Sequence, residues 1–298
     1  MRLRAVLPRS GFSSRWIAGL LAVWSISMVA SCDVSGPVPA YVYVDEFELT
    51  VKQGEGTASE RITEGWFFAN QEFLGAYTLP AVIPVVAEGS TSIRVSPGIK
   101  VNGIVSSPDI YDFYERYDIE LDLAPGRVDS VFPVTSYTDF AEFAFLEDFE
   151  VSNAFIDNRD NNPDTKVELI ENEEVFEGNR SGYIRLDVEN DFIDVASLPI
   201  LTDLPTNNSN VFLEFNYKTN TLLGLGLVGS GQGFPGQAAT IIILTEKEDW
   251  NKIYIDLSGT LFASQLDGYQ IRLTAQHSNG ANPTEIYLDN FKIINIDQ

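Results

Sequence analysis

The chain has 298 residues, with 43 Asp and Glu against 19 Lys and Arg, and a formal net charge of −24 at pH 7. A surface this acidic repels phosphate backbones and anionic headgroups, which excludes nucleic acid as a partner; an anionic lipid or an acidic polysaccharide would need bridging divalent cations. A single Cys and a single His exclude an intrachain disulfide and metal sites built from several His or Cys, and 44% hydrophobic residues exclude a disordered acidic tail.

The first 31 residues have the pattern of an export signal. A basic beginning is followed by an apolar segment over residues 16–30, which is the right length for export and short for a membrane span. The basic residues are Arg2, Arg4, Arg9 and Arg15. Removing them leaves 15 cations against 43 acids, a net charge of −28 on the mature chain.

The signal ends in the four residues VASC, with Cys32 last. This resembles the lipobox of bacterial lipoproteins, in which the Cys becomes the lipidated first residue. The resemblance implies a signal peptide over residues 1–31, then a lipidated Cys32 and a tether to residue 39. Val29 and Ser31 would also suit a standard signal peptidase, so an ordinary exported protein is the alternative.

Residues 40–137 predict a first β module. Apolar residues alternate with acids over residues 40–51, and the break between Val44 and Phe47 predicts a bulge. Residues 66–68 and 73–77 predict a hairpin around a tight turn. This stretch resembles the PEGA-like modules of bacterial envelope proteins, which implies a small PEGA-like or immunoglobulin-like sandwich. The residues that carry the resemblance are Asn70, Gly75, Pro80 and Gly89.

Residues 138–298 predict a second β module. Short strands of five to ten residues, bounded by turn residues, predict a sandwich. One helix is predicted over residues 260–266, TLFASQL. The order of the pieces is similar to the galactose-binding-like jelly rolls found as carbohydrate-binding modules. The residues that carry this similarity are Phe149, Glu150, Trp250, Tyr254, Asp256, Leu257 and Leu288 to Phe291.

The jelly-roll resemblance implies that the first and last strands lie side by side and share a structural Ca²⁺. It would place Glu150 and Asp289 as ligands, with Asp148 as a third. Converging carboxylates repel one another, and a hard cation with oxygen ligands relieves that repulsion. The alternative is that these acids face solvent or pair with Lys292 or Arg185.

Two further acidic patterns are weaker. Asp160, Asn162, Asp164 and Glu171 have the spacing of an EF-hand loop, but Thr165 replaces the Gly and no helices flank it, so we predict a solvated loop. Glu189, Asp191 and Asp194 come close to the laminarinase-type glycosidase motif, but its last Glu is replaced by Asp.

Two other motifs suggest chemistry that the surrounding sequence does not support. Gly224, Gly226 and Gly229 spell a dinucleotide fingerprint without a following helix, so we predict a closely packed strand and a loop over residues 229–237. His277 lies in a turn-rich segment with no nucleophile elbow, which predicts a surface residue.

The sequence therefore predicts an all-β, non-catalytic, lipid-anchored envelope protein, in the style of Bacteroidota-like Gram-negative lipoproteins. We place it at the outer membrane, with the periplasmic and surface faces both open, and expect its jelly roll to bind glycan or an envelope partner. The alternatives are an assembly lipoprotein that binds no sugar, and a glycoside hydrolase. Phe234, Tyr269 and Tyr183 are the candidate stacking aromatics, and Trp250 is predicted to lie in the core.

Overall fold

A computed structural model describes residues 36–231, 234–278, 280 and 282–296 of the chain. Its contacts set residues Pro39–Gln298 apart as one compact unit. Cys32 and the predicted signal peptide lie outside the described residues. Within those residues, no helix is long and apolar enough to cross a membrane.

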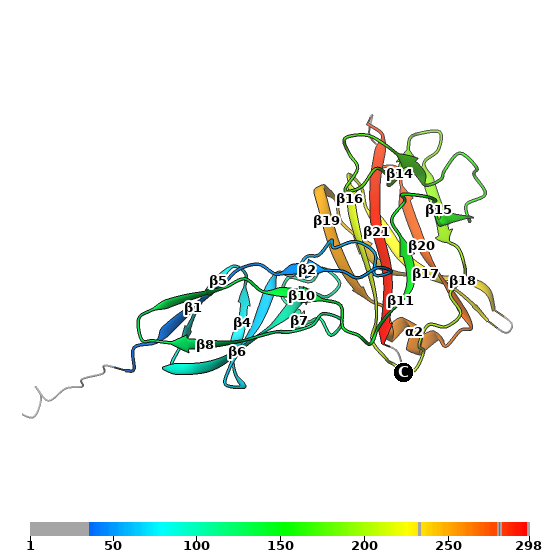
Figure 1. Cartoon of the computed structure of the whole chain (residues 1–298). Coiled ribbons are helices and arrows are strands. Elements are labelled where there is room, and N and C mark those ends of the chain that lie inside the picture. The colour runs from blue at the N-terminus through cyan, green and yellow to red at the C-terminus, as the bar shows by residue number, and fades with distance from the viewer. Residues whose placement is uncertain (1–35, 232–233, 279, 281, 297–298) are drawn as a thin grey trace, which may run out of the picture. The chain divides into compact units, whose positions relative to one another are not determined.

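The first module of the Pro39–Gln298 unit is built from short strands (Figure 1). They form a three-stranded sheet in the order β5-β1-β9, a pair β10-β2, and a five-stranded sheet in which β3 and β8 flank β6. The strands are β1 (Ala40–Val44), β2 (Glu48–Thr50), β3 (Glu64–Ala69), β4 (Glu72–Thr78), β5 (Ala81–Val85), β6 (Gly89–Lys100), β7 (Pro108–Ile110), β8 (Tyr117–Leu123), β9 (Val128–Val131) and β10 (Val134–Ser136).

The predicted hairpin in this module is confirmed as β3 and β4. Its two turn residues, Asn70 and Gln71, have positive φ angles of 49° and 70°, the backbone twist that suits a two-residue hairpin. Asn tolerates this conformation better than most residues do. The turn therefore fixes the pairing of Ala69 with Glu72 and of Phe68 with Phe73, and the register shifts by one residue before Phe67 pairs with Gly75.

The predicted irregularity between Val44 and Phe47 is confirmed. Val44 lies opposite Val131 and Glu48 lies opposite Val134, so the segment with β1 and β2 has one more residue here than the parallel segment with β9 and β10. Both Val44 and Phe47 are buried in the core. The extra residue breaks the alternation, so that both apolar side chains face the core.

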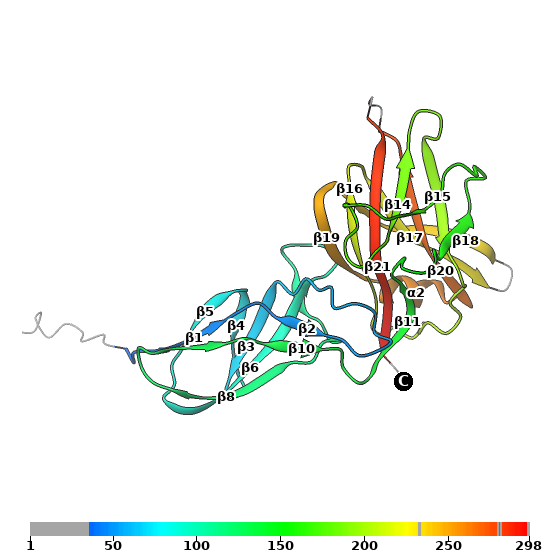
Figure 2. The ribbon, with the colours of Figure 1, turned by 45° about the horizontal axis from the view of Figure 1, so that its top comes forward.

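The second module is a sandwich of two sheets (Figures 1 and 2). The six-stranded sheet runs β13-β14-β21-β16-β19, with β11 also paired to β21, and the five-stranded sheet runs β12-β15-β20-β17-β18. The elements are β11 (Ala141–Glu147), β12 (Phe155–Asn158), β13 (Glu168–Ile170), β14 (Ser181–Leu186), β15 (Phe192–Ser197), β16 (Val211–Thr219), β17 (Leu223–Gly231), β18 (Phe234–Leu244), β19 (Lys247–Asp256), α2 (Ser258–Ser264), β20 (Gly268–Gln276) and β21 (Thr284–Ile296).

The all-β sandwich prediction is confirmed, and so is the expected pairing of first and last strands. Ala141 at the start of β11 lies opposite Ile296 at the end of β21. The helix is displaced by two residues from its predicted place. It ends at Ser264 because Gln265 takes the left-handed conformation and its N–H bonds to the Leu261 carbonyl.

The predicted loop over residues 229–237 is instead mostly strand, since β17 runs to Gly231 and β18 begins at Phe234. A Cβ at Gly226 would lie 1.9 Å from the carbonyl oxygen of Ala239 on β18. A Cβ at Gly224 would lie 2.3 Å from the Thr274 hydroxyl on β20. The glycines therefore allow close strand packing, as predicted, and no dinucleotide-binding helix follows them.

The predicted boundary at Tyr137 falls between β10 and β11, yet the two cores are not separate. One cluster of buried apolar residues lies between the two sheets of the second module. The other cluster fills the first module, and it also includes Phe212, Tyr254 and Ile294 of the second module. The two modules therefore share apolar packing across the boundary.

Candidate functional site

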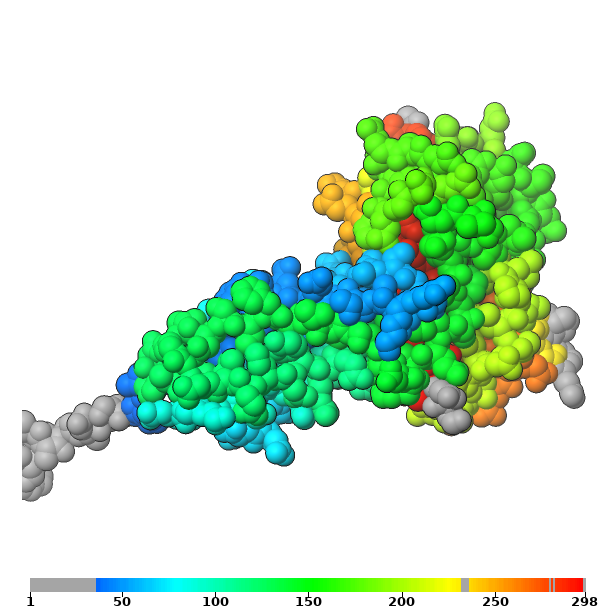
Figure 3. Space-filling model, viewed as in Figure 1, coloured from blue at the N-terminus to red at the C-terminus, as the bar shows by residue number. Residues whose placement is uncertain are grey.

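The first module covers one half of the outer face of the six-stranded sheet. The regular alternation of side chains along β21 is interrupted at Asn290, whose φ is 53°. The pairing of β21 with β16 shifts at the same level, between Glu214 and Asn216. Such an irregularity moves the following side chains to the other face. Beyond it, Lys292 lies under the first module and donates a 2.6 Å hydrogen bond to the Thr57 carbonyl. The chain segment after β2 accordingly runs across this part of the sheet (Figure 3).

A buried charge network holds this contact. Glu214 on β16 is fully buried and lies 2.9 Å from the Lys252 ammonium on β19. Tyr111 and Tyr137 of the first module donate hydroxyl hydrogen bonds of 2.7 and 3.1 Å to the same carboxylate. Lys292 reaches the Tyr137 hydroxyl at 3.1 Å. A carboxylate buried in this way requires such partners.

The pKa values follow from this burial. Burial acts to raise the pKa of Glu214, but Lys252 and then Lys292 outweigh it and hold the pKa below its ordinary value. Burial lowers the pKa of Lys292 to about 8, against the opposing charge of Glu214. Burial also raises the pKa of Tyr111 well above its ordinary value, with Glu214 adding to the effect. The network is therefore built to keep one anion charged between two modules.

The other half of the same sheet face is not covered by the first module, and it carries a row of aromatic rings. We call these four residues, on three strands and one loop, the aromatic stripe. All four are half-buried. They are Phe176, Tyr183, Trp250 and Tyr287.

The rings of the stripe contact one another across the strands. Tyr183 on β14 lies directly opposite Tyr287 on β21, with ring centroids 5.0 Å apart. Trp250 on β19 lies 6.3 Å from Tyr287 and 5.2 Å from Phe176. The Trp250 indole donates a 3.2 Å hydrogen bond to the Glu174 carbonyl, which anchors the loop that carries Phe176.

Charged groups flank the stripe. The Tyr183 hydroxyl donates a 2.8 Å hydrogen bond to Glu285. The Lys218 ammonium lies 5.3 Å from the centre of the Tyr287 ring and forms an ion pair with Glu174. Half-buried rings beside carboxylates and ammonium groups are the combination with which proteins stack and hydrogen-bond sugars.

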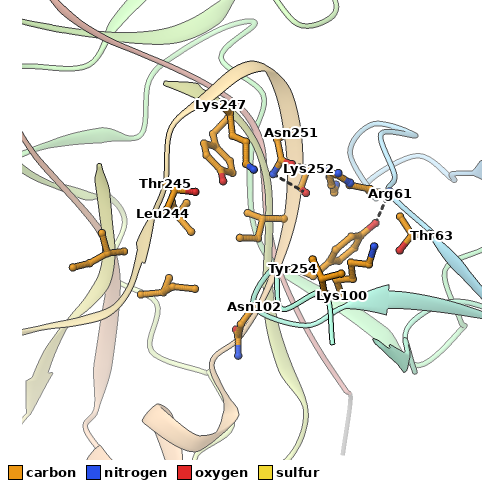
Figure 4. A pocket seen from close by; sticks show the side chains of 16 residues that line it. Arg61, Thr63, Lys100, Asn102, Leu244, Thr245, Lys247, Asn251, Lys252 and Tyr254 are labelled. Atoms are coloured by element: carbon orange, nitrogen blue, oxygen red, sulfur yellow. Dashed lines mark hydrogen bonds between the residues drawn. The ribbon is translucent and has the colours of Figure 1, made fainter. Parts of the chain in front are cut away.

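A pocket of about 310 Å³ lies elsewhere in the unit, beside the edge strand β19 (Figure 4). Its charged lining comes from both modules, with Arg61 and Lys100 from the first and Lys247 and Lys252 from the second. Arg61 is positioned across the boundary: its backbone N–H donates a 2.9 Å hydrogen bond to the Tyr254 hydroxyl, and its guanidinium donates to Asn251.

In the structure, each of the three predicted calcium ligands accepts hydrogen bonds from donors of its own. Glu150 accepts bonds from the backbone N–H groups of Asn179 and Arg180 at 2.6 and 2.9 Å. Asp289 is buried and accepts a 2.6 Å bond from the Ser181 hydroxyl. Asp148 is exposed and accepts a 3.1 Å bond from the Glu150 N–H.

Burial raises the pKa of Asp289 to about 7, and the charges of Glu177 and Asp148 add to the rise. Across the described ranges, no group of three or more His, Cys, Asp or Glu side chains is arranged to hold a metal ion. The alternative pairing of these acids with Lys292 or Arg185 is also missing from the ion pairs of the described residues. The calcium site stays a prediction.

The EF-hand-like loop is held by its own side chains. Asp160 accepts hydrogen bonds of 2.9 Å from the Thr165 hydroxyl and from the Asp194 N–H. The glycosidase-like acid Asp194 is itself bound by Arg272 through two hydrogen bonds of 2.7 Å. Both oxygens of that carboxylate are therefore engaged by a cation.

His277 lies in the loop that follows β20, as predicted, and is half-buried, with its Nδ1 3.2 Å from the Thr284 hydroxyl. Trp250 is not a core residue, because its ring packs on the outer face of the sheet. Tyr269, a predicted stacking residue, is buried and bonds Ser264. Tyr183 is the predicted aromatic that the structure places on the stripe, and its partner Tyr287 was missed.

The sequence matches no family profile and no curated protein. Among solved structures, a CBM22-1 xylan-binding domain from Paenibacillus barcinonensis is similar at 17% identity and a TM-score of 0.38, over 54% of this chain and 99% of that one. A family 30 carbohydrate-binding module is similar at 14% identity and a TM-score of 0.37, over 51% of this chain and 97% of that one. A protein described among carbohydrate-binding modules of the β-sandwich superfamily is 13% identical with a TM-score of 0.37, over 80% of this chain and 86% of that one. Values this low assign no ligand or activity to this chain.

Proposed function

We propose that this protein is a non-catalytic, lipid-anchored envelope protein whose jelly roll binds glycan on the aromatic stripe. The observation that carries the proposal is the cross-strand pair of Tyr183 and Tyr287, with Trp250 beside it, on the half of the sheet that the first module leaves uncovered. Rings held in register by neighbouring strands form a stacking surface that needs no ordering on binding.

The polar groups beside the stripe supply the second requirement of a sugar site. Glu285 accepts from Tyr183 and has further acceptor capacity, while Lys218 lies over Tyr287 as a donor. Pyranose rings present apolar faces to aromatic side chains and hydroxyl groups to such donors and acceptors. We therefore expect a neutral glycan with an exposed pyranose face.

The test is glycan-array and calorimetric binding of residues 36–298, compared between the wild type and Tyr287→Ala. We expect the substitution to lower affinity at least tenfold, since the stacking ring is removed. Phe262→Ala is the matched control, because Phe262 is a 49% exposed aromatic of the same module on α2. Equal binding by wild type and Tyr287→Ala, with both folded by circular dichroism, would overturn the stripe as the site.

The anchor is proposed from Cys32 and the signal before it. A lipidated Cys would hold an anionic body at the envelope, because each buried methylene contributes about 0.8 kcal/mol. We propose the outer membrane as the place. Cys32→Ser should abolish palmitate labelling and release the protein from the detergent phase, whereas unchanged partitioning would remove the anchor from the proposal.

One observation favours the assembly function as a second candidate. Val82 on β5 and Val128 on β9 are more than half exposed, and they lie opposite Tyr43 and Tyr41 on the shared neighbour β1. A row of apolar side chains on one sheet face suits contact with another protein. If an envelope protein co-purifies with the wild type and not with Val82→Glu, and no glycan binds, the assembly function replaces glycan binding.

A further inference from the structure

The pocket beside β19 concentrates positive charge in a strongly negative protein. Four of the cations of a chain with 43 Asp and Glu line it, and no described Asp or Glu does. Figure 4 shows Lys247 and Asn251 on one side and Arg61 and Lys100 on the other. A random surface of this composition would place acids among these groups.

Two of these cations are left without a carboxylate. Lys252 is committed to Glu214, and Lys100 lies 3.5 Å from Glu64. Arg61 and Lys247 form none of the ion pairs found in the described part of the chain. Most Lys and Arg side chains of this part do have such a partner. In a protein with this excess of acids, unpaired cations that face one pocket are a specific feature of that pocket.

The rest of the lining is partly apolar and partly able to hydrogen-bond. The apolar lining includes the exposed Val105 and Ile243 as well as the buried Tyr217, Leu244 and Ile253. Asn102, Asn251, Thr63 and Thr245 add amide and hydroxyl groups. A small inorganic anion would leave this apolar lining and these groups unused, whereas a sugar ring carrying an acid group would use all three kinds of surface.

We propose that this pocket binds an acidic sugar residue, a uronate, with Arg61 contacting its carboxylate and Lys247 adding positive charge from the other side of the pocket. Arg binds carboxylates through a planar pair of donors, and Lys adds a point charge. The rest of this acidic surface would need bridging divalent cations to bind an acidic polysaccharide. In this pocket, the side chains of Arg61 and Lys247 provide the positive charge instead. It shares no residue with the aromatic stripe, so it does not depend on the function proposed there.

The test is calorimetric titration of residues 36–298 with a galacturonate trisaccharide. The comparison probes are the same trisaccharide with its carboxyl groups reduced to alcohols, and inorganic phosphate. The variants are Arg61→Gln and Lys247→Gln. Arg116→Gln is the control, because it removes an exposed Arg of the first module that does not line the pocket.

We expect the uronate to bind the wild type and the Arg116→Gln variant alike, and each pocket variant to bind it about tenfold more weakly. The reduced trisaccharide should not bind the pocket. Tyr287→Ala should keep uronate binding, which separates this proposal from the glycan site on the stripe. The proposal would be overturned if the wild type did not bind the uronate, or if the pocket variants bound it as tightly as the wild type does. It would also be overturned if phosphate bound more tightly and the uronate could not displace it.

Discussion

The Tyr111 hydroxyl lies 2.7 Å from Oε1 of Glu214, so a residue of the first module satisfies a carboxylate buried on the sheet of the second. The Tyr111 ring also packs edge-on against Phe212 and Tyr254, with centroids 5.2 and 5.1 Å away. The same residue thus contributes apolar packing and a charge-assisted hydrogen bond to the boundary. Because both depend on the two modules being in place, the unit should unfold as one.

Tyr111→Phe should lower the free energy of unfolding by about 1.5–3 kcal/mol, the range for a hydrogen bond to a charged group. The ring packing is kept, so the loss reports the hydroxyl alone. Urea unfolding monitored by circular dichroism measures it. Tyr43→Phe is the control, since its hydroxyl donates a longer bond of 3.2 Å to the partly exposed Asp45, and its loss should cost less than that of the Tyr111 hydroxyl.

Removal of the buried anion itself should cost more. Glu214→Gln leaves Lys252 without its ion-pair partner in a dry boundary, and breaking such a pair costs about 3–5 kcal/mol. The same urea unfolding experiment measures this loss. A variant as stable as the wild type would show that the network contributes nothing to holding the modules together.

The lowered pKa of Lys292 predicts that the free energy of unfolding rises with pH in the alkaline range. Its pKa is lowered to about 8 by burial in the folded state, whereas an unfolded chain keeps the lysine proton to about pH 10.4. Between these values the unfolded state binds more protons than the folded state. The free energy of unfolding should therefore rise with pH across this interval, through this group, by at most about 1.4 kcal/mol per pH unit.

Unfolding at pH 8.0 to 9.5 tests this, because above that range the tyrosines of the unfolded chain begin to ionise while the buried ones do not. Lys292→Met should remove the rise. Lys166→Met, which removes an exposed lysine, should keep it. Identical pH profiles for wild type and Lys292→Met would contradict the assignment.

The sequence was sufficient for the class of fold and for the hairpin of β3 and β4. Alternation and turn residues act locally, and both were visible at Asn70 and Gln71. The break between Val44 and Phe47 was visible as lost alternation, but the parallel neighbour of both strand segments, residues 128–136, was not. Register along one strand is local information, but the identity of its neighbour is not.

The candidate sites depended on such neighbours. Tyr183 was predicted to be a stacking aromatic, but its pairing with Tyr287 joins strands separated by about a hundred residues. Trp250 was predicted to lie in the core because the family that the module resembles has a Trp at this strand start, yet it occupies the outer face of an edge strand. Arg61 and Lys247 come from different modules, so nothing in the sequence indicated that they line one pocket.

The calcium prediction has a direct test on Glu150. Its carboxylate holds the loop at Asn179 and Arg180, so Glu150→Gln should lower the melting temperature by about 2 °C without any metal. A calcium site on Glu150, Asp289 and Asp148 requires a second effect. Millimolar calcium must then raise the melting temperature of the wild type relative to EDTA, and not that of the variant. Equal values in calcium and EDTA would remove the site.

The pair of Asp194 and Arg272 gives the last prediction. Both side chains are about 15% exposed and meet through two hydrogen bonds of 2.7 Å. Asp194→Ala leaves a mostly buried guanidinium without its partner and should lower the free energy of unfolding by about 2 kcal/mol. Asp191→Ala is the matched control three residues away, because Asp191 is exposed, and its effect should stay within about 0.5 kcal/mol. Urea unfolding of both variants measures the difference, and equal stabilities would contradict a structural role for Asp194.

The structural role of Asp194 is also the reason why we expect no glycosidase activity from this acid. Both oxygens of its carboxylate are bound by Arg272, so it is not free to transfer a proton to a leaving group.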